Sequence, residues 1–195
     1  MATTMEQVRA WRGPALWSYG FRPFFLAAGL WALIGIAVCV PWYLGHISLP
    51  SAFAPLDWHI HELLFGYVPA VVAGFLLTAV PNWTGRLPVV GWRLIALFSL
   101  WMLGRLAMAS SALLPSWLVA AASLSFLVAL AATAAREIVA GKNHRNLRIV
   151  VLVSLLAVAQ IAFHVEAAVT GQTVYAPRFG IAAVILLISV VGGRI

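Results

Sequence analysis

Residues 24–44 read FFLAAGLWALIGIAVCVPWYL and contain no Asp, Glu, Lys, Arg or His. A helix needs about 20 consecutive apolar residues to cross the hydrocarbon core of a membrane, and this stretch is long enough. Further apolar runs follow at residues 59–80, 92–114, 117–135, 149–169 and 175–193. They lack the period-two alternation of membrane-spanning strands. The sequence therefore predicts an all-α, polytopic transmembrane helix bundle of about six spans, with residues 1–195 as one transmembrane domain.

The composition supports a membrane environment. Of the 195 residues, 64% are hydrophobic and 9% are charged, whereas a soluble domain is about 25% charged. The net charge of +7 could indicate a nucleic-acid partner, but the basic residues alternate with the spans and do not form one soluble face. We therefore expect a lipid bilayer as partner and no nucleic acid. The single Cys39 excludes an internal disulfide and a covalent CxxCH haem site.

The basic residues predict the orientation. The chain has 12 Lys and Arg residues. All except Arg105 and Arg178 lie before span one, between span two and the first residues of span three, between spans four and five, or after span six. The opposite loops, residues 45–57, 115–116 and 170–177, contain no Lys or Arg. The positive-inside rule then places both termini in the cytoplasm.

Polar groups within the spans gather at one depth. Span two starts on the outer side, and spans three and five end there. The outer part of the membrane would therefore hold all of the following residues: His59, His61, Glu62, Arg105, Gln160, His164 and Glu166. Charged and imidazole groups in hydrocarbon are costly and are commonly functional. A shared depth predicts a shared site.

Helix periodicity adds detail to this prediction. His59 and Glu62 are three residues apart and share a face, whereas His61 projects to another side. Small residues continue the first face, which would let a neighbouring helix approach closely. We expect His164 to lie near His59 or His61, and Arg105 to pair with Glu62 or Glu166.

Three interpretations of this cluster remain open from the residues alone. The first is purely structural, with hydrogen bonds and salt bridges joining the helices. The second is a haem or copper site, because neutral imidazole binds both metals and a carboxylate can orient a ligating histidine. The third is a transport path for protons or ions. The chain contains no zinc-protease HExxH, since residue 65 is Phe65.

Longer motifs resemble the NnrS family of bacterial membrane proteins. They are GFRPFF at 20–25, WHIHELLFG at 58–66, AGFLLTAVPNWTGR at 73–86, GR at 104–105, NLR at 146–148 and GGR at 192–194. The resemblance covers nearly the whole chain, and residues 58–86 carry its most specific part.

This resemblance implies a role in nitric oxide metabolism or resistance to nitrosative stress at the bacterial inner membrane. It also implies non-covalent b-type haem and copper as cofactors and nitric oxide as a partner. On that basis we predict His59, His61 and His164 as cofactor and metal ligands. Their supporting residues would be Glu62, Arg105, Gln160 and Glu166. Family members continue beyond the point where this chain ends, so we expect it to be the N-terminal half and to need the missing C-terminal half.

Overall fold

The computed structural model describes residues 11–192, and every regular element in that range is helical. Six helices or continuous helical stretches are long and apolar enough to cross a membrane. Their bounds are α2 (Phe21–Tyr43), α3 to α4 (Pro55–Thr84), α5 (Trp92–Ala109), α6 (Ser116–Ala140), α7 (Leu147–Thr170) and α8 (Tyr175–Gly192). The chain is therefore an all-helical, multi-pass membrane protein.

The second span consists of three consecutive elements. It begins as α3 (Pro55–His61), continues as the π-helical η2 (Glu62–Tyr67) and ends as α4 (Val68–Thr84). Short 3-10 turns complete the fold: η1 (Ala15–Ser18), η3 (Ser111–Leu113) and η4 (His144–Asn146).

Each predicted span lies on one of these helices, but two ends differ clearly. We predicted a span over residues 92–114, whereas α5 ends at Ala109, where Ser110 leaves helical geometry and a separate 3-10 turn begins at Ser111. The fourth helix extends beyond residue 135 to Ala140, so that its charged last turns leave the apolar region. Arg9, Gly193 and Arg194, which the sequence arguments used, lie outside the described residues.

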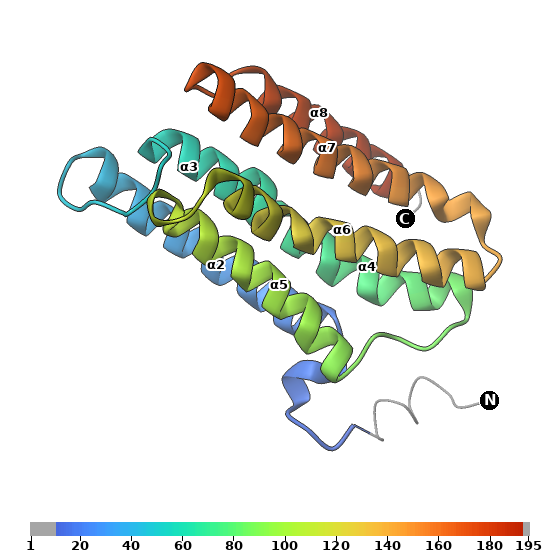
Figure 1. Cartoon of the computed structure of the whole chain (residues 1–195). Helices are drawn as coiled ribbons and strands as arrows, with labels where there is room; N and C mark the ends of the chain where they lie inside the picture. Colours follow the sequence, from blue (N-terminus) through green and yellow to red (C-terminus); the bar gives the residue numbers. More distant parts are fainter. Residues whose placement is uncertain (1–10, 193–195) are drawn as a thin grey trace.

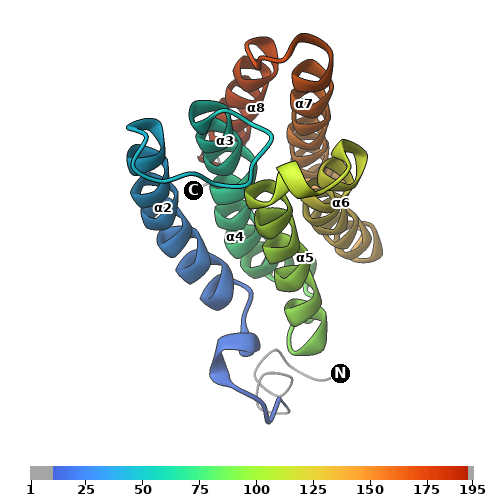
Figure 2. The same cartoon turned by 60° about the vertical axis from the view of Figure 1, so that its left-hand side comes forward.

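The second span occupies the centre of the bundle. In its most apolar window 61% of residues are buried inside the protein, compared with 28% in α8. Its last part, α4, packs against both α2 and α6, while α6 packs against α7 and α7 against α8 (Figures 1 and 2). The central helix therefore has neighbours on several sides, which allows it to bury polar groups away from lipid.

The two ends of the bundle differ in charge. At one end lie the start of α2, the α4–α5 and α6–α7 connections and the end of α8. This end, called the basic end below, carries these described basic residues: Arg12, Arg22, Arg86, Arg93, Arg136, Lys142, Arg145 and Arg148. The opposite end, called the histidine end, carries the start of α3 and the end of α7. The predicted segregation of charge is therefore present in the fold.

Candidate functional site

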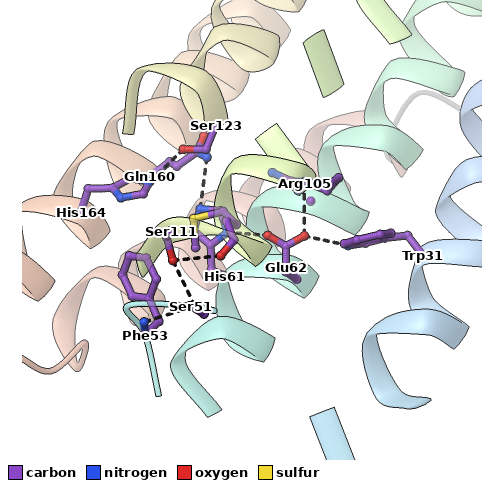
Figure 3. A network of polar contacts seen from close by, with 12 residues as sticks. Trp31, Ser51, Phe53, His61, Glu62, Arg105, Ser111, Ser123, Gln160 and His164 are labelled. Carbon is purple, nitrogen blue, oxygen red and sulfur yellow. Dashed lines mark hydrogen bonds and ion pairs between the residues drawn. The ribbon is translucent and has the colours of Figure 1, made fainter. Parts of the chain in front are cut away.

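A buried carboxylate stands at the centre of the polar cluster. Glu62 is 1% exposed and accepts a hydrogen bond from the Trp31 indole N–H at 2.8 Å. Its Oε2 also lies 3.2 Å from Nε of Arg105, which is 2% exposed. Its Oε1 lies 3.0 Å from Nδ1 of His61. Figure 3 shows this carboxylate between His61 on one side and Trp31 and Arg105 on the other.

Three spans meet at that carboxylate. Trp31 comes from α2, Glu62 from η2 and Arg105 from α5. The π-helical turn of η2 has a local cause: Pro69 lacks an N–H, and in a regular α-helix its ring would clash with the carbonyl four residues earlier. The wider turn is visible in the hydrogen bond from Val68 N–H to the Leu63 carbonyl, five residues back.

His61 is held through both of its ring nitrogens. Its Nδ1 faces the Glu62 carboxylate, and its Nε2 lies 3.3 Å from the side-chain amide nitrogen of Gln160 on α7. With its amide nitrogen toward His61, Gln160 donates to Nε2, and in this arrangement Nδ1 carries the proton that is donated to Glu62. The ring is fully buried. This arrangement fixes one tautomer of His61 and aims its Nε2 lone pair toward α7.

His164 lies directly beside His61. The centroids of the two imidazole rings are 5.3 Å apart, with the rings nearly perpendicular. His164 is only partly buried, and its Nε2 is 2.9 Å from the hydroxyl oxygen of Ser123 on α6. The cluster therefore joins α2, η2, α5, α6 and α7 at the histidine end.

Arg105 is wedged against a glycine of the central helix. A Cβ atom built on Gly66 would overlap Nη1 of Arg105 and lie 3.0 Å from the Glu62 carboxylate. Trp101, one turn earlier on α5, donates its indole N–H to the Gly66 carbonyl at 2.9 Å. Gly66 is therefore needed for close approach, because only a residue without a side chain leaves room for the guanidinium.

Several buried polar atoms in and around the cluster have no hydrogen-bond partner within the described residues. They are Nη1 of Arg105, Oε1 of Gln160, Nδ1 of His59 and Nε1 of Trp58, while Nε of Arg105 has its ion-pair contact with Glu62 but no hydrogen bond. Unsatisfied buried polar groups are rare in folded proteins and commonly mark functional positions or bound water. Nη1 of Arg105 and Oε1 of Gln160 belong to side chains of the cluster itself, which distinguishes it from an ordinary helix contact.

Glu166 lies apart from this network. Its carboxylate accepts hydrogen bonds from the backbone N–H groups of Val174, Tyr175 and Ala176, at 2.8–3.2 Å. It thus satisfies the first turn of α8. Of the two carboxylates considered for Arg105, the structure pairs it with Glu62.

An open pocket adjoins His164 at the histidine end. It has a volume of about 540 Å³. Phe53, Asp57, Ser111, Trp117, His164 and Thr173 are among its lining residues. The Asp57 carboxylate accepts a hydrogen bond from the Thr173 hydroxyl at 2.5 Å, which ties α3 to the α7–α8 connection. His164 therefore lies between this pocket and the buried network.

The predicted ligands fit a metal only in part. Within residues 11–192 no group of three or more His, Cys, Asp or Glu side chains is arranged to hold a metal ion. His61 and His164 are in ring contact, so a porphyrin plane does not fit between them. The donor chemistry of His61 does fit, since its Nδ1 proton faces a carboxylate as in metal-ligating histidines, and a metal would take the place of the Gln160 amide at Nε2. His164 also fits a metal ligand, because its imidazole lines the pocket from which a metal could be reached.

His59 does not join this pair. It is partly buried, and its Nδ1 has no partner among the described residues. Sequence periodicity placed His59 on the same face as Glu62 and turned His61 away, whereas His61 is the residue that contacts Glu62. Glu62 and Gln160 both make side-chain contacts with His61.

Sequence reasoning missed Trp31, Trp101 and Ser123. A signal was present for the two tryptophans, because both lie well inside apolar spans and not near span ends, where an aromatic belt occurs. A buried indole N–H needs an acceptor, so an interior tryptophan indicates a polar partner. Ser123 gave no comparable signal.

The comparisons with known proteins identify a family. The family model described as NnrS protein matches residues 15–195. Searches of curated proteins and of solved structures gave no match. With most of the chain covered by that model, this six-span membrane protein belongs to the NnrS family.

Proposed function

We propose that this chain is a bacterial inner-membrane metalloprotein of nitric oxide metabolism or of resistance to nitrosative stress. Membership of the NnrS family suggests a role related to nitric oxide. The single observation that carries the metal part is the carboxylate–histidine pair of Glu62 and His61 beside His164. Burying an ionised or imidazole group in a span is costly, which favours a functional use of this cluster.

The residues have distinct roles in this proposal. His164 binds haem iron or copper from the side of the pocket, and His61 supplies a second imidazole for a small ion. Glu62 holds the His61 ring in the tautomer that leaves Nε2 as acceptor, while Arg105 balances the carboxylate charge. The metal, when bound, would supply the centre that nitric oxide meets.

No chain of ionisable residues in the described helices supports the alternative of a proton or ion path across the membrane. Between the cluster and the basic end, the interior positions of the described helices carry no Asp, Glu, Lys, Arg or His. Residues there form an apolar core that includes Phe24, Leu76, Leu97 and Leu130. The cluster therefore has polar access toward the histidine end alone.

Cofactor content of purified variants tests the proposal. We expect His164→Ala and His61→Ala to reduce bound haem or copper, and His59→Ala to retain most of it. His46→Ala and His144→Ala are matched controls, because both histidines are exposed and lie away from the cluster. Full cofactor content in the His164 and His61 variants would refute the assignment, as would an equal loss in the controls.

A further inference from the structure

A second open pocket lies at the basic end, away from the histidine cluster. The α4–α5 connection, residues 85–91, forms it together with Trp11, the start of α5 and Glu137 of α6, and its volume is about 780 Å³. Gly85 and Gly91 have φ angles of 66° and 63°, which L side chains rarely adopt. A Cβ on Gly91 would lie 2.8 Å from the Trp11 ring. The loop is thus shaped by two glycines around that indole.

The pocket carries an excess of positive charge. Arg86 and Arg93 line it, and its one acidic lining residue is Glu137. Glu137 is paired with Arg86, whose Nε lies 2.5 Å from Oε2. Within the described residues no carboxylate forms an ion pair with Arg93. Arg93 is exposed and remains available to an anion.

The start of α5 adds to the positive potential of this pocket. Its N-cap, Gly91, has no side chain to cap the helix, and its first turn contains no acidic residue. Gly91, Trp92 and Arg93 all line the pocket. Backbone N–H groups of a first helical turn carry positive partial charge and favour an anion. These N–H groups therefore add to the positive charge of Arg93 in the same pocket.

The surroundings resemble those of a lipid headgroup. The pocket lies where α4 and α5 leave the apolar part of the bundle, and Leu87, Val89 and Val90 add apolar walls. Trp11 and Trp92 make an edge-to-face contact at 6.2 Å, and Trp92 is 76% exposed. Tryptophan is enriched at membrane interfaces, and basic pockets there bind anionic headgroups.

We propose that this pocket binds the headgroup of an anionic phospholipid in the leaflet at the basic end. The phosphate contacts Arg93 and Arg86, and the acyl-glycerol part lies against Leu87, Val89 and Trp92. The eight described basic residues of this end face a single described acidic residue, Glu137, so the whole end favours an anionic leaflet. This proposal does not depend on the metal site.

Titration of the detergent-purified chain tests this site. Short-chain phosphatidylglycerol, short-chain phosphatidylcholine and inorganic phosphate are added separately, and the midpoint of thermal unfolding is followed. We expect phosphatidylglycerol to raise the midpoint and the other two compounds to have a much smaller effect. Arg93→Gln should weaken the apparent affinity about fivefold, since one basic residue near an anionic surface contributes about 1 kcal/mol. Arg86→Gln should weaken it similarly.

Two variants control for unspecific charge effects. Arg148→Gln removes an exposed cation at the same end outside the pocket, and Arg178→Gln removes one at the histidine end. Both should keep the affinity of the unaltered chain. Equal stabilisation by phosphatidylcholine would overturn the proposal, and so would equal losses in the two controls. Stabilisation by inorganic phosphate alone would show a phosphate site in place of a lipid site.

Discussion

The ion pair between Arg105 and Glu62 should be the strongest single polar link between spans. The Arg105 and Glu62 side chains are 2% and 1% exposed, and the carboxylate has three side-chain partners: Arg105 Nε, Trp31 Nε1 and His61 Nδ1. Removing one partner of a buried pair leaves an uncompensated charge, which costs about 3–5 kcal/mol. We expect Arg105→Met to lower the free energy of unfolding by about that amount.

A double-mutant cycle separates the pair from its surroundings. Glu62→Gln keeps the shape and hydrogen-bonding ability of the side chain but strands the guanidinium. The double variant carries neither charge, so its loss should be smaller than the sum of the single losses. We expect a coupling energy of about 2 kcal/mol, within the range measured for residues of one network.

Reversible unfolding in mixed micelles, followed by tryptophan fluorescence, measures these differences. The Arg86–Glu137 pair is the matched control, because Arg86 is 42% exposed and Glu137 is 17% exposed. Its coupling should stay below about 1 kcal/mol, as is usual for exposed pairs. Additive losses at Arg105 and Glu62, or a coupling no larger than that of the control pair, would refute the reasoning.

Three further predictions follow from the geometry. Gly66→Ala should destabilise the protein by about 1–3 kcal/mol, because the added methyl group overlaps the Arg105 guanidinium. Gly29→Ala is the control, since its methyl group meets open space and should not destabilise the protein. Equal effects of the two variants in an unfolding titration would contradict this. Glu166→Gln should speed amide hydrogen exchange at residues 174–176, because its carboxylate accepts their N–H groups; unchanged exchange would argue against its capping role. Reporter fusions should place residue 50 outside and residue 142 in the cytoplasm, and the reverse readings would overturn the orientation.

The spans could be predicted from the sequence because length and hydropathy alone determine them. The run at residues 24–44, for example, is recognised as a spanning helix without any knowledge of how it packs against the other spans. The histidine end could be predicted for a similar reason. Alternation of the spans puts Glu62, Arg105 and His164 at one depth whatever the packing.

Contacts within the cluster could not be predicted in full. Sequence periodicity placed His61 on a different face from His59 and Glu62, because it treated the second span as a regular helix with one buried face. That span lies at the centre of the bundle and contains a π-helical turn before Pro69, so adjacent residues such as His61 and Glu62 are both buried. Likewise, the role of Glu166 depends on the α7–α8 turn, which periodicity does not describe.

The absorption spectrum and copper content of the purified chain, before and after addition of nitric oxide, test the central claim most directly. We predict haem absorption or bound copper in the unaltered chain, and a change of that signal when nitric oxide is added. His164→Ala should weaken both the signal and its response, while His46→Ala should leave them unchanged. An intact protein with neither haem nor copper, or a signal that His164→Ala does not alter, would contradict the account.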